Sequence, residues 1–444
     1  MANFQSIKHP QELLLHRKRK NKRIPLSDSD TFMPAEPVVA IYGPNASGKS
    51  TLVDALHFFV SAVKNSYRVW EIDSGVPAKP FLLDEESRLA PMEFEVEFIA
   101  ADGVRYQYGF QVLESRIHSE WLYAYRTARG TLLFERYEEE GTTAVSFGNT
   151  FRGEKKQIEE IAQLRSNSLV LSIATQLGNA MLLEVYRWFS NNIGTYEAAA
   201  YAAGISPVVE KIEGDKEFAQ KMSRVLSMAD LGVSGVRVEE QPLSQEELEH
   251  MLRLVEALNN SVVNSEQLKK KLQNNKQIVL THTGQGNEFT LPFSSESDGT
   301  MALIAIANIV IEALETGTTI VIDEIDSSLH PLLVAELVEV FQDVRSNPKH
   351  AQLIFTTHDT SLLNKSSSSN KLLAREQIWI TEKNIHGETS FVALDEYKPR
   401  AEENLERGYL TGRYGGIPSL GVFDIFRTLN QEPAPENVGA LVSS

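Results

Sequence analysis

The sequence has no cysteine, no run of 18 apolar residues, and fewer basic than acidic side chains. The absence of cysteine excludes disulfides, thiolate metal sites and cysteine nucleophiles, and it fits a reducing cytoplasm. Without a long apolar run, no membrane span is expected. The first ten residues, MANFQSIKHP, also lack the apolar core of an export signal, so we expect a cytoplasmic protein.

The charge balance restricts the partners of the chain. It carries 43 lysine and arginine residues against 60 aspartate and glutamate residues, a formal net charge of −17. Such a chain is not a non-specific coat for nucleic acid, because binding phosphates needs a positive field. One basic run, Arg17–Arg23, could contact nucleic acid, a nucleotide or an acidic partner, or could be a solvated face.

A phosphate-binding loop is the strongest motif. The apolar stretch 38–42 predicts a buried strand, and 51–64 has the apolar spacing of a helix. Between them the chain fits G-x-x-x-x-G-K-[ST], a pattern whose backbone N–H groups cradle phosphates at a helix N-terminus. The alternative is a glycine-rich turn without a ligand. The predicted phosphate-binding residues are Gly43, Pro44, Asn45, Ala46, Ser47, Gly48, Lys49, Ser50 and Thr51.

Two side chains of this loop have specific roles in the prediction. Lys49 is expected to reach the β- and γ-phosphates of ATP, and it is a predicted catalytic residue. The hydroxyl of Ser50 is expected to bind Mg²⁺.

A second apolar strand, 319–322, ends in two carboxylates. In a nucleotide site Asp323 would hold Mg²⁺, and Glu324 would polarise the attacking water. Without the phosphate loop, a solvated strand end would explain these residues equally well. Asp326 follows in a short loop that is also expected to contact the nucleotide.

A third apolar strand, 353–356, leads to His358. A histidine at the carboxyl end of a strand is well placed to sense a γ-phosphate, although a lone histidine is often structural. We predict the sensor role because the phosphate loop is present in the same chain.

A second anion site is predicted at the helix start Ser297-Asp298-Gly299. One nucleotide does not need two phosphate cradles on the same protomer. We therefore expect this turn to close on a nucleotide that another protomer holds. The alternative is an ordinary Ser/Asp helix cap.

Periodicity divides the rest of the chain into regions. Alternation around Asp102-Gly103 predicts an antiparallel β lobe. Helical spacing covers 152–228, and a long polar helix is expected at 244–273. Further strands are predicted at 4–7, 12–16, 132–137, 144–147, 233–238 and 277–282. The predicted domains are the N-terminal half of the nucleotide core with the β lobe (1–150), a helical insertion (151–283), the C-terminal half of the core (284–432) and a flexible tail (433–444).

The order of these motifs resembles that of the ABC-type ATPase head, in the branch of the SMC, RecF and OLD (overcoming lysogenisation defect) proteins. Three stretches resemble more narrowly the AAA-family ATPases of bacterial abortive-infection and anti-phage systems, such as the AriA subunit of PARIS and the ATPase of AbiL or RloA type. These stretches are Glu296–Thr300, Asp323–Pro331 and Gly408–Pro418.

The resemblance implies an α/β fold with a mixed-sheet nucleotide core, an antiparallel β lobe and an inserted helical, coiled-coil-like subdomain. It also implies an ATPase that uses ATP and Mg²⁺ and forms a head-to-head homodimer, or a larger homo-oligomer, around two nucleotides. Such ATPases act with a separate effector, commonly a nuclease of TOPRIM or related type, in anti-phage or toxin–antitoxin defence, where a phage product can be the trigger. No Q-loop glutamine is found, and Asp84–Arg88 stands roughly in its place.

Two other functional classes stay open. A RecF- or SMC-like repair ATPase would load onto DNA directly, with Arg17–Arg23 as a contact. A stand-alone ATPase would serve a small-molecule or transport role. The pair Asp323 and Asp326 has the look of a nuclease metal pair, but the phosphate loop explains both, and we expect the chain itself not to cut nucleic acid.

Overall fold

The computed structural model describes residues 1–15, 18–19, 22–23, 35–139, 142–197, 205–229, 232–240, 276–284, 287–327, 329–364, 366–367, 370–400 and 402–418. The polar helix predicted at 244–273 and the tail from 433 lie outside the described residues. Arg17, Lys20 and Asn21 of the basic run do too, and its other residues form two short paired strands, β1 (Lys18–Arg19) and β2 (Lys22–Arg23).

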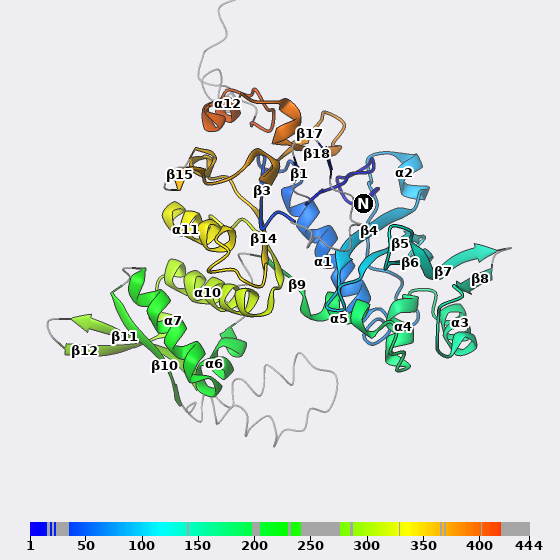
Figure 1. Cartoon of the computed structure of the whole chain (residues 1–444), viewed down its shortest axis with the longest axis horizontal. Helices are drawn as coiled ribbons and strands as arrows, with labels where there is room; N and C mark the ends of the chain where they lie inside the picture. The colour runs from blue at the N-terminus through cyan, green and yellow to red at the C-terminus, as the bar shows by residue number, and fades with distance from the viewer. Residues whose placement is uncertain are drawn as a thin grey trace, which may run out of the picture.

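A six-stranded mixed sheet forms the centre of the molecule, with the strand order β18-β17-β3-β14-β13-β9 (Figure 1). All neighbouring strands are parallel except β17 and β18. The central strands are continuous apolar runs because both faces of the sheet are covered. The strands are β3 (Val38–Tyr42), β9 (Ile193–Glu197), β13 (Thr319–Asp323), β14 (Gln352–Thr356), β17 (Ile378–Lys383) and β18 (Thr389–Ala393).

Alternate side chains of the sheet pack on opposite faces. Val39 and Ile41 belong to a buried cluster that includes residues of α1, whereas Val38 and Ala40 belong to a larger cluster with α10 and α11. Helices α1 and α10 therefore lie on opposite faces of the central sheet. The three helices are α1 (Lys49–Asn65), α10 (Asp298–Thr316) and α11 (Pro331–Gln342).

A five-stranded antiparallel sheet forms the predicted β lobe, in the order β4-β5-β6-β7-β8. At its first turn the Asp102 carboxylate accepts the N–H of Val104 at 3.0 Å, and Gly103 has a φ of 72°, so the turn signal is confirmed. The strands are β4 (Met92–Ile99), β5 (Arg105–Leu113), β6 (Arg116–Tyr125), β7 (Thr131–Glu139) and β8 (Thr142–Phe147).

Three helices form in the stretch that was predicted to belong to the helical insertion (151–283), but they pack against the β lobe. Their apolar side chains share one buried cluster with the lobe and with the C-terminal half of α1. The buried carboxylate of Glu120 on β6 also accepts the N–H groups of Val170 and Leu171, which ties α4 to the lobe. The helices are α3 (Lys155–Leu164), α4 (Val170–Gln176) and α5 (Leu183–Asn191).

The remainder of the predicted insertion forms an arm, which we define as α6 and α7 with the sheet β10-β11-β12. Its apolar side chains belong to the same buried cluster as those of α10. In Figure 1 the arm and the β lobe project to opposite sides of the central sheet. The strands predicted at 233–238 and 277–282 are present, and β12 was not predicted. The elements are α6 (Ile205–Gly214), α7 (Lys216–Met228), β10 (Val233–Glu240), β11 (Lys276–Gly284) and β12 (Asn287–Pro292).

The sequence also gave no indication of β9, which lies in a stretch predicted to be helical. This strand has only five residues and joins the central sheet at its edge, where Ile193 pairs with Thr319 of β13. A short edge strand of this kind is stabilised by pairing with its neighbouring strand rather than specified by its own sequence pattern, since strand formation depends strongly on context.

The two short strands expected near the N-terminus are wrong for the described residues. Residues 1–15 contain only isolated bridges, Ala2 to Glu93 and Phe4 to Ile7. For the stretch 4–7 the reason is local, because Asn3 and Gln5 have φ values of 51° and 48°, outside the extended region.

The C-terminal part of the described chain covers the end of the sheet near β17 and β18 (Figure 1). It carries the last helix, α12, which follows the β17–β18 hairpin. The remaining elements are α2 (Glu85–Leu89), η2 (Phe293–Ser295), η3 (Thr360–Leu363), β15 (Ser366–Ser367), β16 (Asn370–Lys371), η4 (Arg375–Gln377), η5 (Leu394–Tyr397) and α12 (Leu405–Leu410).

Among the described helices, α10 alone is long and apolar enough to cross a membrane by length and composition. Its apolar side chains pack instead against the central sheet and the arm, in the largest buried cluster of the molecule. A core helix of this kind passes the same test as a membrane span, so the finding is weak evidence for a membrane role.

Candidate nucleotide site

The phosphate loop joins β3 to α1, as the motif predicts. Ala46 has a φ of 63° and Gly48 a φ of 107°, so the loop folds back on itself before the helix. Gly48 is the N-cap of α1 and has no side chain to satisfy the first N–H groups of the helix. A helix N-terminus with open N–H groups carries partial positive charge and favours an anion.

The side chain of Lys49 lies along the inner side of this loop. It is 5% exposed, and its Nζ donates to the carbonyl oxygens of Gly43 and Pro44 at 3.0 and 3.2 Å. Burial lowers the pKa of Lys49, and the negative charges of Asp323 and Glu324 act in the opposite direction. The predicted lysine therefore lies within electrostatic reach of the carboxylates predicted from the second strand.

Thr356 at the end of β14 organises the carboxylates at the end of β13. Its hydroxyl donates to Asp323 Oδ1 at 2.5 Å and accepts the N–H of Glu324 at 2.7 Å. Glu324 itself has a φ of 50° and an exposed side chain. The turn therefore directs Asp323 toward the sheet edge and leaves the Glu324 carboxylate open to solvent, where a water could be polarised.

Asp326 and His358 meet at the same edge. The Asp326 carboxylate accepts the backbone N–H of His358 at 3.1 Å through Oδ2, and no described residue donates to its buried Oδ1. Burial, followed by the positive charge of Lys49, lowers the pKa of the His358 ring. A ring that is neutral near pH 7 can donate a hydrogen bond to a phosphate oxygen.

The donor set fits a magnesium ion held together with a triphosphate. Mg²⁺ prefers oxygen ligands and is usually held by one or two carboxylates plus substrate phosphates. Asp323 and the exposed Ser50 supply a carboxylate and a hydroxyl near the phosphate loop. Groups of three or more His, Cys, Asp or Glu side chains that could hold a metal do not occur among the described residues, and this kind of site does not require one.

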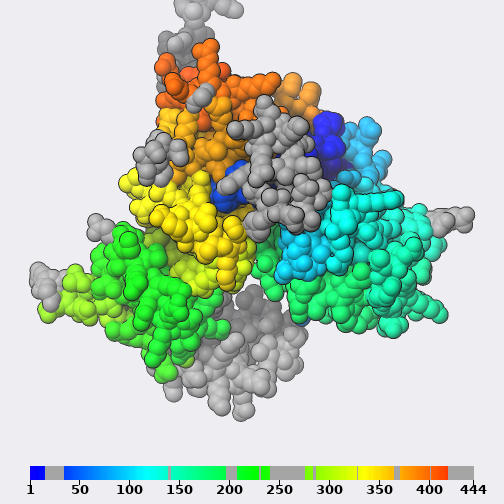
Figure 2. All heavy atoms as spheres, in the orientation of Figure 1, coloured from blue at the N-terminus to red at the C-terminus, as the bar shows by residue number. Residues whose placement is uncertain are grey.

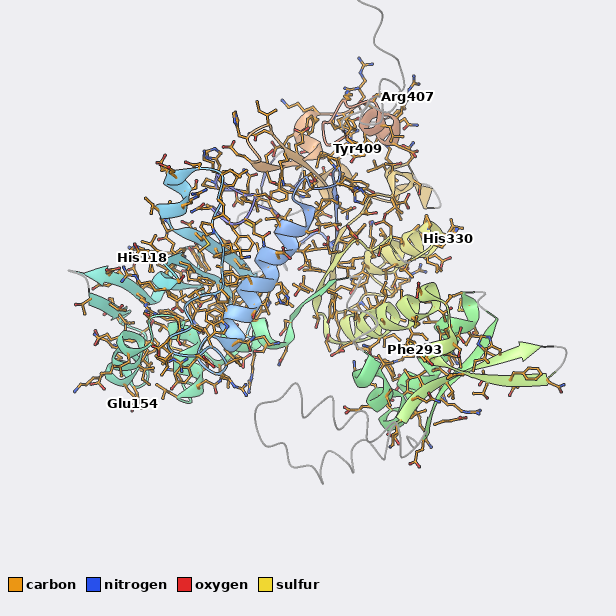
Figure 3. The ribbon with its side chains drawn as sticks, turned by 180° about the vertical axis from the view of Figure 1, so that it is seen from behind. His118, Glu154, Phe293, His330, Arg407 and Tyr409 are labelled. Carbon is orange, nitrogen blue, oxygen red and sulfur yellow. The ribbon has the colours of Figure 1, made fainter. Side chains whose placement is uncertain are left out.

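The predicted second anion site lies elsewhere. Ser297 caps α10 by accepting the N–H of Thr300 at 3.2 Å, and Ser297 and Asp298 are exposed. Gly299 follows in the first turn of the helix. Phe293, just before this turn, belongs to the cluster on the α10 face, and Figure 3 shows it near the arm. Among the described residues, no hydrogen bond joins this turn to the phosphate loop of the same chain.

The stretch Asp84–Arg88 does not supply a substitute for the Q-loop glutamine in the described contacts. The Asp84 side chain caps α2 by accepting the N–H groups of Glu86 and Ser87, and it forms an ion pair with Lys8 at 3.5 Å. These contacts explain the acidic start of α2 as helix capping.

Sequence reasoning missed three threonines around the site: Thr356, Thr381 and Thr389. All three are at most 3% exposed, and each hydroxyl bonds to a site residue or to the phosphate loop. The sequence offered little to single out these threonines, because threonine is common in strands for packing reasons. Only the pairing of the strands shows that these hydroxyls face the loop.

A parallel core sheet with a phosphate loop and carboxylates at a strand end defines a nucleotide-binding protein of the phosphate-loop class. A family model described as an AAA domain, putative AbiEii toxin, type IV TA system, matches residues 38–169 and 192–364. The match covers more than half of the chain, and the chain belongs to this family.

The mixed central sheet with helices on both faces confirms the predicted α/β fold class. Several solved structures are similar to the chain at low identity and low TM-score. An SMC head bound to the C-winged helix domain of ScpA has 14% identity, covers 88% of this chain and 94% of its own, and has a TM-score of 0.39. RecF, a recombination mediator protein, has 14% identity, coverages of 88% and 96%, and a TM-score of 0.30. CbiO1 from Clostridium perfringens, part of an ABC transporter complex, has 11% identity, coverages of 93% and 96%, and a TM-score of 0.25. No curated protein sequence matches the chain significantly.

Proposed function

We propose that this protein binds ATP with Mg²⁺ and hydrolyses its β–γ phosphoanhydride bond, which gives ADP and phosphate. The observation that carries the proposal is the convergence of Lys49, Asp323, Glu324, Asp326 and His358 at the uncapped start of α1. Family membership supports it independently.

In this proposal each site residue contacts the phosphates, the Mg²⁺ ion or the attacking water. The open N–H groups of the loop and the ammonium of Lys49 hold the phosphates. Ser50 and Asp323 hold Mg²⁺, which neutralises charge on the phosphate oxygens when bound. Glu324 accepts a proton from the attacking water, and neutral His358 donates to the γ-phosphate.

We further propose that two such chains close head to head around two nucleotides. The Ser297-Asp298-Gly299 turn would then contact the triphosphate held by the partner subunit. Its exposure and its position on the face of the sheet opposite α1 support a role across a subunit boundary.

The nucleotide-driven closure would control a separate effector in anti-phage defence, and a nuclease is the proposed class of effector. The energy required is modest. ATP at about 100 times its Kd stabilises a closed state that alone binds it by roughly 2.7 kcal/mol per site. That is enough to switch an assembly poised near balance.

Four measurements on the purified wild-type chain test the proposal. Calorimetric titration should show ATP binding that needs Mg²⁺, phosphate release should accompany it, and size-exclusion chromatography should show a larger species with ATP. Incubation with DNA or RNA should leave the nucleic acid intact. A chain that binds no nucleotide contradicts the first proposal, and cleavage that follows the chain through stringent purification contradicts the need for a separate nuclease.

A further inference from the structure

The glycine-rich segment Gly408–Pro418 has no part in the proposed chemistry, yet it packs directly behind the phosphate loop. Tyr409 is 7% exposed, and its ring meets the ring of Tyr42 edge to face, with centroids 5.8 Å apart. Tyr42 is the last residue of β3, immediately before the loop. In Figure 3 Tyr409 lies on the inner side of α12, whereas Arg407 of the same helix lies at the outer rim.

Two glycines bring this segment against β17. The N–H of Gly416 donates to Glu382 Oε1 at 2.8 Å. A Cβ on Gly415 would lie 1.7 Å from the same oxygen, and one on Gly416 would lie 2.5 Å from Ile380 Cγ2. Both glycines also have positive φ values, 68° and 62°. A side chain at either position would strain the backbone and displace Glu382 or Ile380, so the two glycines allow the segment to pack closely against β17.

Thr381 stands between those two residues and bonds to the phosphate loop. Its Oγ1 donates to the carbonyl oxygen of Tyr42 at 3.1 Å and lies 2.6 Å from Ser47 Oγ. A carbonyl oxygen can only accept, so the threonine proton is directed to Tyr42 and Ser47 donates to Thr381. A Cβ on Gly43 would lie 2.0 Å from this Oγ1, which explains the first glycine of the motif by contact with β17.

Thr389 on β18 holds the other side of the loop. Its Oγ1 lies 2.8 Å from the carbonyl oxygen of Ser47 and 2.9 Å from Ser6 Oγ. Ser6 Oγ in turn lies 3.0 Å from Thr51 Oγ1. In Figure 2 the orange C-terminal part lies beside the dark-blue N-terminal residues, in agreement with these contacts.

We propose that Thr381 and Thr389 are positioning residues that hold Ser47, and through it the phosphate loop, in the conformation that binds nucleotide. The segment Gly408–Pro418 holds Thr381 in place through β17. This inference rests on the proposed binding of ATP, but it adds a determinant that lies more than 300 residues from the loop in sequence.

The first test compares Thr381→Val with Thr381→Ser. Valine keeps the volume and removes the hydroxyl, which leaves Ser47 Oγ and the Tyr42 carbonyl without this partner, so ATP affinity should fall about tenfold. Serine keeps the hydroxyl and should bind within about twofold of wild type. The matched control is Thr319→Val, at the far end of the sheet, where the hydroxyl bonds only to Gln352 among the described residues.

A positioning role also predicts which kinetic constant changes. The KM for ATP should rise in Thr381→Val while kcat stays near the wild-type value, since Asp323 and Glu324 are on another strand. Equal ATP affinity in wild type and in Thr381→Val, with wild type binding ATP, would overturn the inference and leave the proposed function intact. Absence of ATP binding in wild type would overturn both.

The second test addresses the segment itself and remains informative if Thr381→Val folds poorly. Glu382→Ala removes the acceptor of the Gly416 N–H and should weaken ATP binding about threefold in the wild-type background and by a smaller factor in the Thr381→Val background. An unchanged affinity in Glu382→Ala, or additive effects of Glu382→Ala and Thr381→Val, would contradict the link through β17.

Discussion

The two longest described helices, α1 and α10, begin in different ways. The first turn of α1 has no side-chain cap and no acidic residue, whereas α10 has Ser297 as its cap and Asp298 in its first turn. The same argument from sequence predicted an anion site at both helix starts. The structure shows that α1 leaves its N–H groups open for a ligand, while α10 has already satisfied part of its own requirement.

This difference suits the two helix starts to different roles: the start of α1 can bind a phosphate by itself, and the start of α10 can add a contact to a nucleotide that is already bound. A free N-terminus with a lysine beside it can bind an anion by itself. A capped N-terminus with an aspartate beside it disfavours a lone phosphate, so in the proposed dimer the α10 turn would contact a nucleotide whose charge Lys49 and Mg²⁺ already reduce. The contrast is consistent with a secondary contact made across a subunit boundary.

The largest expected effect is the loss of Lys49. We expect Lys49→Ala to weaken ATP binding by about a hundredfold or more, because a buried ammonium next to the phosphates is removed. Calorimetric titration measures this effect, with Lys276→Ala in the arm as the control. Unchanged affinity in Lys49→Ala would remove the basis for treating the α1 start as the nucleotide site.

Glu324→Gln should affect turnover and leave binding in place. The amide cannot accept the proton of the attacking water, so we expect hydrolysis to slow on the order of a hundredfold while ATP still binds. The closed dimer should then accumulate and be visible by size-exclusion chromatography with ATP. The matched control, Glu315→Gln at the exposed end of α10, should turn over normally. Normal turnover in Glu324→Gln would show that another group is the base.

A mixing experiment sharpens the comparison between the two helix starts. Ser297→Ala should lower turnover about tenfold and cost about 1 kcal/mol of stability through the lost cap. If the turn acts across the subunit boundary, each mixed dimer of a Ser297→Ala chain and a Lys49→Ala chain has one intact site and one defective site. With random exchange about half of the dimers are mixed, so an equal mixture of the two variants should hydrolyse ATP at about a quarter of the wild-type rate. A mixture no more active than the two variants alone would place the turn outside the partner's site.

The sequence predicted which residues lie at the carboxyl edge of the central sheet, because local motifs determine their position. A buried strand that ends in Asp323 and Glu324 has to deliver both carboxylates to the carboxyl edge of a parallel sheet, next to the loop that follows β3. The hydroxyls of Thr381 and Thr389 could not be found in this way. They reach Ser47 only because β17 pairs with β3, and no local pattern specifies that pairing.

The organisation of the middle of the chain was harder to predict. Helical spacing in 155–191 identified helices but not their neighbours, and α3–α5 pack with the β lobe rather than with the arm. The edge strand β9 is a similar case, since its place beside β13 depends on tertiary pairing. The predicted domain boundary near 150 therefore lies inside the cluster that joins the lobe to α3.

The smallest expected effect concerns His358 and the pH dependence of stability. Its pKa lies below the usual 6.5, mainly through burial, so between the two values the unfolded chain binds more protons than the folded chain. Stability contributed by the neutral ring is full above about pH 6.5 and declines as the pH falls through that window. Because the side chain is partly exposed, the change in Tm should be below about 2 °C.

Thermal unfolding between about pH 5 and 7.5 should show a smaller decline in Tm in His358→Gln than in wild type. With His386→Gln as the control for an exposed histidine outside the site, identical slopes in His358→Gln and wild type would contradict the lowered pKa of the His358 ring.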